Sequence, residues 1–573
     1  MTTPPTEPTP AEPTPAGSTP AESTPLPAPP AESRPARGPW RGRIARIAGA
    51  VGVLTLTAAV AAAGYAAPVP ADVVVAPRSV AVPPSPRVLT CAGPLVLPDG
   101  AGTGDSAFDR VPVPVRTDVR VLTVPGAGAR AASAGTLTPL AGGEAITTLD
   151  PVGSGAAAGR ATGVTGATLL YAAPLDESAP LIGGATASVT TAGDLRGLSA
   201  ASCQAPSADQ WLVGGSTEIG NTSQLIVTNP GATAAQVTVE LFGPSGRAGL
   251  GGSGSFLVAP GAEKVVVLAG VAAEQSRIAV HVSAAGGLIT AHVQDNRLDG
   301  FTPAGTDLVS AGTAPARRQV VGGLVVPEST IDGPDVAQLR LLVPGDTGAT
   351  ATLSLLGPDG PVVLPGAETI SLAPGEVTDV SLGGLPAGAY TAVVDADEPL
   401  VAAVMITRTG LPGQLDDLPT LERAWGAAAV PAAGGVVALP AGVSGTVLLA
   451  GIGPDDGGEG GGSATGTLRT FGDDGALLDE REVSVPAGTT MALPVTSLAG
   501  GVAVGGLQLV LPDTTSATAT GDDATSGPAV LSWSMLGYVA AADGELVSVL
   551  TPVPVATATP SVDVRAARTL GLP

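Results

Sequence analysis

Short runs in which apolar and polar residues alternate recur along most of the chain. Val237, Val239 and Leu241, for example, alternate with Thr238 and Glu240. This period of two predicts strands with one buried face, because successive side chains of a strand point to opposite sides of its sheet. Glycine and proline are frequent between the runs, which is typical of turns. We therefore expect a mainly β protein.

The pattern repeats after 114 positions without a gap. Gln224–Leu225 overlies Gln338–Leu339, and Ala259–Gly261 overlies Ala373–Gly375. A looser third copy starts near Gly445. The first copy holds about seven short runs bounded by turns, which predicts tandem β-sandwich modules of the immunoglobulin or fibronectin type. A β-propeller-like repeat is the alternative, although its blades would recur roughly every 40 to 50 residues.

These patterns and the shifts in composition divide the chain into eight expected segments. They are a disordered Pro/Thr-rich cytoplasmic tail (1–39), a basic flank with a transmembrane helix (40–67), a Pro-rich spacer (68–87), a divergent β module (88–206), three β-sandwich repeats (207–320, 321–427 and 428–545) and a C-terminal tail (546–573). Insertions at 455–463 and 514–527 in the third repeat are expected to be surface loops.

The N-terminal region carries a membrane signal. Five arginines between Arg34 and Arg46 precede the uncharged apolar run Ile47–Ala67. About 20 apolar residues in a helix span a hydrocarbon core of about 30 Å, and the positive-inside rule places the tail in the cytoplasm. We expect a signal anchor in the cell membrane with the bulk of the chain extracellular. Cleavage near Ala61–Gly64, which would give a secreted protein, is the alternative.

The net charge and the number of cysteines argue against several classes of partner and site. The formal net charge of -24 argues against binding nucleic acid through a basic surface. The chain has two cysteines, Cys91 and Cys203, which are too few for a disulfide framework or a four-cysteine zinc site. An exported location favours a single disulfide between them, and two free buried thiols are the alternative.

Motifs that suggest chemistry have structural explanations. The Gly-x-Gly-x-x-Gly pattern at Gly249–Gly254 leads into a strand-like run rather than the helix that nucleotide binding requires. His281 and His292 are expected to face each other across a hairpin turning at Gly286–Gly287, with both imidazoles in solvent. Two ligands make a weak metal site, and Gln294 and Asp295 are doubtful third ligands. We expect no metal and no cofactor.

Catalysis is not expected either. No nucleophile elbow or zinc-protease motif occurs, and the acidic turns near Asp455 and Asp473 lack the spacing of a calcium loop and suggest solvated turns. Trp211, Trp425 and Trp533 recur about once per repeat, as core anchors would. Only carboxylates remain as general bases, so a carboxylate-based glycoside hydrolase is the least favoured alternative.

The chain resembles a family of actinobacterial exported single-pass proteins catalogued as a domain of unknown function (family 5719). The resemblance covers nearly all of the exported part, through Cys91, Cys203, the run Trp211–Gly215 and the turn Leu225–Gly231. It implies a location in the cell envelope and supplies no catalytic residues.

The expected function is therefore that of a non-catalytic, membrane-anchored extracellular structural or adaptor protein of the actinobacterial cell envelope. Its partners would be the membrane, through one N-terminal helix, and an envelope protein. A cell-wall carbohydrate-binding protein is the alternative.

Overall fold

The computed structural model forms two compact units, one of residues 1–78 with 563–573 and one of residues 79–562. The described residues are 51–60, 62, 78–95, 116–126, 131–151, 155–176, 178–331, 333–412, 417–454, 462–512, 528–555 and 561–564. The expected cytoplasmic tail (1–39), parts of the expected membrane helix and spacer, and most of the two expected insertions lie outside them.

In the first unit, residues 51–60 are helical and fall inside the apolar run Ile47–Ala67. Among the helices described, none combines the length and the apolar character needed to cross a membrane. The membrane anchor stays a prediction.

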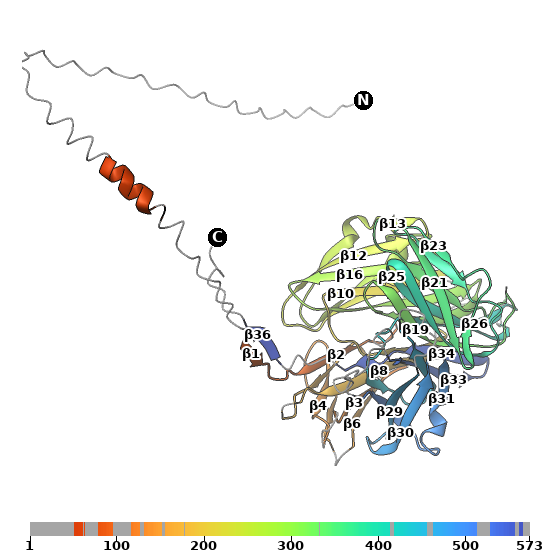
Figure 1. Cartoon of the computed structure of the whole chain (residues 1–573). Helices are drawn as coiled ribbons and strands as arrows, with labels where there is room; N and C mark the ends of the chain where they lie inside the picture. Colours follow the sequence, from red (N-terminus) through yellow and green to blue (C-terminus); the bar gives the residue numbers. More distant parts are fainter. Residues whose placement is uncertain are drawn as a thin grey trace, which may run out of the picture. The chain divides into compact units, whose positions relative to one another are not determined.

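The second unit is mainly β, as the alternation predicts (Figure 1). In β12 (Ala235–Gly243), Val237, Val239 and Leu241 are buried while Thr238 is exposed. Leu225 in β11 pairs with Val293, and Leu339, 114 positions later, pairs with Val404. The sequence repeat is thus a repeat of strand pairing.

The strands fall into four groups, named here modules 1 to 4. Module 1 contains β2 (Arg87–Cys91), β3 (Arg116–Val124), β4 (Gly135–Pro139), β5 (Thr147–Leu149), β6 (Ala157–Thr162), β7 (Thr168–Ala172), β8 (Leu181–Thr190) and β9 (Gly197–Ser202). Module 2 contains β10 (Asp209–Val213), β11 (Asn221–Asn229), β12, β13 (Gly246–Ala248), β14 (Ser255–Val258), β15 (Ala262–Val267), β16 (Ala279–Ala285), β17 (Thr290–Asp299) and β18 (Thr302–Ser310).

Module 3 contains β19 (Ala316–Val326), β20 (Gln338–Leu342), β21 (Ala349–Gly357), β22 (Gly360–Val362), β23 (Ile370–Leu372), β24 (Val377–Ser381), β25 (Gly388–Pro412) and β26 (Pro419–Ala427). Module 4 contains β27 (Gly435–Ala438), β28 (Ser444–Ile452), β29 (Ser463–Gly472), β30 (Leu477–Pro486), β31 (Thr490–Pro494), β32 (Val504–Val510), β33 (Val530–Ala541) and β34 (Gly544–Leu550). The remaining elements are β1 (Arg78–Ala81), β35 (Val553–Pro554), β36 (Ser561–Val564) and the 3₁₀ turns η2 (Gly251–Gly254), η3 (Leu268–Gly270) and η4 (Val495–Ser497).

All four modules share one pairing scheme. One sheet has the strand order first, sixth, third, fourth. The other sheet has the strand order fifth, second, seventh, eighth. The fourth strand is split into β13 and β14 in module 2 and into β22 and β23 in module 3, where β25 also merges the sixth and seventh strands. Module 1, expected to be divergent, follows the same scheme.

Within each module the two sheets bury their apolar faces against each other. In module 2, Val237 and Val280 of one sheet share a core with Leu225 and Val293 of the other. Three of the expected segment boundaries fall inside strands. They are the boundary after residue 87, inside β2, the boundary after residue 320, inside β19, and the boundary after residue 545, inside β34.

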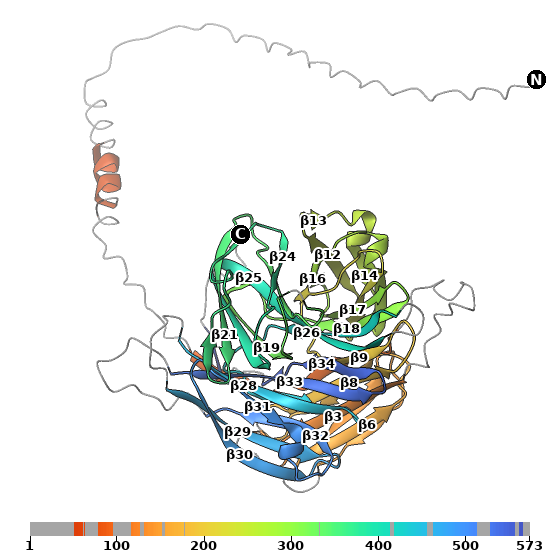
Figure 2. The same cartoon turned by 90° about the vertical axis from the view of Figure 1, so that its right-hand side faces the viewer.

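The modules themselves pack into a closed cycle. Apolar clusters cross every junction: Leu195 packs with Leu308 between modules 1 and 2, and further clusters join modules 2 and 3, 3 and 4, and 4 and 1. The eighth strands β9, β18, β26 and β34 contact one another in the same cyclic order, and Figure 2 shows them together where the modules meet. This arrangement buries polar residues of those strands.

Candidate functional site

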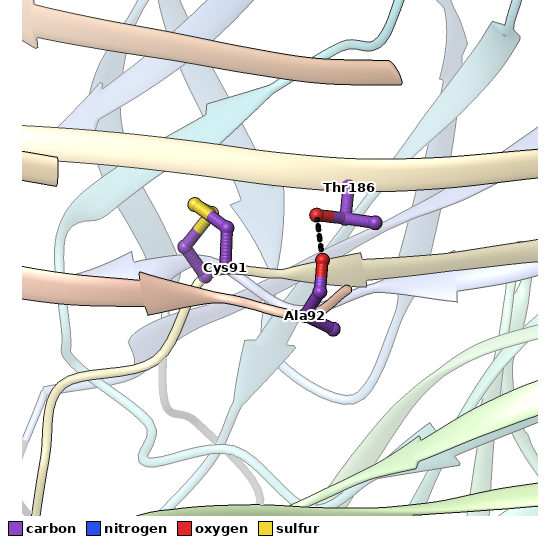
Figure 3. The surroundings of a disulfide bond; sticks show 4 residues. Cys91, Ala92 and Thr186 are labelled. Atoms are coloured by element: carbon purple, nitrogen blue, oxygen red, sulfur yellow. Dashed lines mark hydrogen bonds between the residues drawn. A yellow bond between two sulfur atoms is a disulfide. The ribbon is translucent and has the colours of Figure 1, made fainter. Parts of the chain in front are cut away.

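The two cysteines form a disulfide. Cys91 ends β2 and Cys203 follows β9, so the bond ties the two sheets of module 1 together. Both residues are buried. Next to the bond, the Thr186 hydroxyl donates to the carbonyl oxygen of Ala92 at 3.0 Å, as Figure 3 shows. The surroundings are apolar strands, which suits a structural crosslink.

The expected histidine hairpin is wrong. His281 lies on β16 and pairs with Trp211 and Glu240, whereas His292 lies on β17 in the other sheet and pairs with Ile226. The segment at 286–287 carries the chain from one sheet to the other. The alternation of apolar residues was uninformative here, because it faces Val280 and Val293 into the same core in either arrangement.

His281 lies at the surface in a chain of polar contacts. Its Nδ1 is 3.0 Å from Glu240 and its Nε2 is 2.8 Å from Asp209, and its ring stacks on Trp211 at 4.2 Å between centroids. Arg247 completes the chain with an ion pair of 2.7 Å to Glu240. No nucleophilic hydroxyl or thiol has a hydrogen bond to this imidazole among the described residues.

His292 is buried between modules 1 and 2. It lines a cavity of about 120 Å³ together with Glu263, Gln294 and Leu95. Burial lowers the pKa of His292 to about 4 and raises the pKa of Glu263. In the part of the chain that the structure describes, no group of three or more His, Cys, Asp or Glu residues could hold a metal ion.

The largest concentration of buried charge lies on the eighth strands. Glu422 on β26 is 1% exposed and accepts hydrogen bonds from the backbone N–H of Leu198 at 2.8 Å and of Val547 at 3.4 Å. Arg196 lies 3.6 Å from Glu422 and donates to Asp543 at 2.6 Å. Burial raises the pKa of Glu422 well above its ordinary value. One carboxyl group therefore links modules 1, 3 and 4.

Asp307 on β18 is the second central acid. It accepts a hydrogen bond from the backbone N–H of Trp425 at 2.7 Å and contacts the Ser548 hydroxyl at 2.8 Å. Burial raises the pKa of Asp307 to about 8, although these hydrogen bonds act in the opposite direction. Modules 2, 3 and 4 meet at this group.

Asp295, on β17, extends the network within module 2. It accepts hydrogen bonds from the Ser223 hydroxyl at 2.9 Å and from the Trp425 indole N–H at 3.1 Å, and it lies 3.3 Å from Arg423. Arg340 stacks over Trp425 and donates to the carbonyl oxygen of Gly215 at 2.6 Å. Sequence reasoning had considered Asp295 only as a metal ligand, because nothing local shows that Trp425 comes to lie beside it.

The remaining sequence motifs are structural. Gly251–Gly254 is a 3₁₀ turn that leads into the strand β14. Asp473, expected in a solvated turn, pairs with the buried Arg120 of module 1 at 2.6 Å. Trp211, Trp425 and Trp533 are buried, as expected of core anchors.

The chemistry of these groups is that of assembly. The central carboxyl groups are almost fully buried and hydrogen-bonded to the backbone of other modules, so they hold strands of different modules together.

Comparisons with known proteins show the family of the chain. No curated protein matches it. A solved structure, described as the crystal structure of Thermotoga maritima 1070, is similar at 18% identity over 20% of this chain and 95% of that chain, with a TM-score of 0.16. A family model described as a family of unknown function (DUF5719) matches residues 158–496, more than half of the chain. The chain therefore belongs to DUF5719, a family of unknown function.

Proposed function

We propose that this chain is a non-catalytic structural or adaptor protein of the actinobacterial cell envelope, anchored in the membrane by the run Ile47–Ala67 and carrying its β modules outside the cell. The observation that supports this best is the burial of acidic side chains where the modules meet. Glu422, Asp307 and Asp295 are buried and hydrogen-bonded to other modules, so these acidic side chains serve to join the modules.

The modules are proposed to be relatives of the immunoglobulin-type sandwich. They share its pairing of the second strand with the fifth and of the third with the sixth. They differ in that the first strand joins the sixth and the seventh joins the second. Each sixth and seventh strand thereby belongs to different sheets, which accounts for the separation of His281 from His292.

Carbohydrate binding is less well supported. Glycan-binding grooves use exposed aromatic faces, whereas Trp211 is 7% exposed, Trp425 5% and Trp533 3%. A carboxylate-based hydrolase would need two carboxyl groups facing a cleft at roughly 5 to 10 Å from each other. The buried acids Glu422 and Asp307 are instead held in hydrogen bonds to the backbone of other modules.

The test uses the full-length chain in its native membrane. External protease applied to intact cells should remove the β modules and leave an epitope within residues 1–39 protected. The purified chain should release no sugar from cell-wall glycan strands and should not be retained on them, while crosslinking in the native envelope should give protein adducts. Retention on glycan without any protein adduct would contradict the adaptor role.

A further inference from the structure

A cleft between modules 2 and 3 has the size of a ligand site. It measures about 440 Å³, within the range of about 300 to 1,000 Å³ that is usual for binding pockets. Module 2 contributes Trp211, Phe242 and His281, and module 3 contributes the loop at 343–347 with Glu398 and Pro399. We name it the Trp211 cleft.

The charges of the module 2 wall are already matched. Arg247 pairs with Glu240 at 2.7 Å, and His281 contacts both Glu240 and Asp209. These contacts hold the wall in one arrangement without a ligand, which reduces the entropy that a ligand would lose on binding.

The module 3 wall carries unmatched negative charge. Asp346 is exposed and Glu398 is partly exposed, and both line the cleft. Neither carboxylate pairs with a cation within the described residues. With Glu240 on the other side, three acids and one arginine line this cleft among the described residues. The formal net charge of -24 adds a field that attracts positively charged partners.

Arg247, on the module 2 side of the cleft, shows how a cation binds at this cleft. The guanidinium of Arg247 lies 5.3 Å from the centre of the Phe242 ring, over its face, while its Nη1 contacts Glu240. A carboxylate beside an aromatic or apolar surface suits a guanidinium or ammonium on an apolar stem. Pro344 and Pro399 offer such a surface next to Asp346 and Glu398.

We propose that the Trp211 cleft binds an arginine or lysine side chain of a basic segment in a partner protein, with Asp346 and Glu398 as its counter-charges. This inference rests on the adaptor role proposed above and names the chemistry of the partner.

The test measures the anisotropy of a fluorescent (Arg-Gly)₃ peptide with the full-length chain. The double variant Asp346→Asn/Glu398→Gln should weaken binding by about tenfold or more, as expected for losing charge-assisted hydrogen bonds. The matched control, Asp359→Asn/Glu482→Gln, removes the same charge at exposed positions outside the cleft and should bind like the parent. A (Glu-Gly)₃ peptide should not bind.

A second readout locates the site. The chain has two histidines, so ¹³C-histidine labelling gives two Cε1–H signals. The basic peptide should shift the signal of His281, which lines the cleft, and leave that of His292 unchanged. Absence of binding, equal weakening by the control variant, or a shift confined to His292 would overturn the proposal. If crosslinking in the envelope still gave protein adducts, the adaptor role would stand with a different docking surface.

Discussion

The Ser548 hydroxyl lies 2.8 Å from an oxygen of Asp307 and 2.9 Å from the carbonyl oxygen of Ala200. The single proton of the Ser548 hydroxyl can be donated to either oxygen, and donation to the Asp307 carboxylate favours the ionised form of the acid. Burial outweighs this hydrogen bond and raises the pKa of Asp307 to about 8. The contact joins modules 2 and 4 across 241 residues of sequence.

Asp307→Asn should flatten the dependence of stability on pH. The folded-state pKa of about 8 exceeds the ordinary value of 3.8, so Asp307 opposes folding progressively as pH rises from about 4 to about 8. Asparagine has the hydrogen-bonding pattern of the protonated acid and does not ionise. Urea unfolding at pH 5 and pH 8 should show a smaller loss of stability in the variant than in the parent. An identical loss in both proteins would show that Asp307 is not protonated in the fold.

His292→Gln should reduce the loss of stability at acidic pH. Burial lowers the pKa of His292 to about 4. His292 is therefore protonated near pH 6.5 in the unfolded chain and stays neutral in the folded chain until about pH 4. This residue therefore reduces stability as pH falls from about 6.5 to about 4, and the variant should lose less stability over that window. In the parent, the Cε1–H signal of His292 should stay unchanged from pH 8 to pH 5. A midpoint near pH 6.5 for that signal would contradict the buried position.

Trp425→Phe should destabilise the chain by about 1 to 3 kcal/mol, because it leaves an oxygen of the buried Asp295 without its indole donor. Trp533→Phe is the matched control. Its indole nitrogen is buried without a hydrogen-bond partner among the described residues, so losing it removes an unsatisfied donor. Chemical unfolding of both variants compares a similar loss of volume with and without a broken hydrogen bond. Equal destabilisation would mean that the Asp295 contact contributes nothing.

Breaking the disulfide should lower stability by about 2 to 5 kcal/mol. The bond spans a sequence separation of 112 and links the sheets of module 1. The double variant Cys91→Ala/Cys203→Ala should unfold at lower denaturant concentration, and reduction of the parent should shift its midpoint in the same direction. If the reduced parent and the oxidised parent unfolded together, the crosslink would have no stabilising role.

The sequence pattern was sufficient for the strands and for their repetition. Val237, Val239 and Leu241 are buried in β12 because alternation depends only on local backbone geometry and on the free energy of burying apolar side chains. The glycine and proline turns likewise act locally. The equivalence of Leu225 with Leu339 could therefore be read from the chain alone.

Only the tertiary structure decided which strands became neighbours. His281 and His292 lie in different sheets. Asp307 and Glu422 are buried at the junction of the modules, although the neighbouring sequence does not distinguish these acids from ordinary surface residues. The hydrogen-bond partners of Asp307 and Glu422 come from strands one or two modules away, and the packing of four modules on one another selects those partners. The local alternation of apolar and polar residues by itself determined the repeated β modules. The burial of charged side chains where the modules meet depended on packing between residues far apart in the sequence.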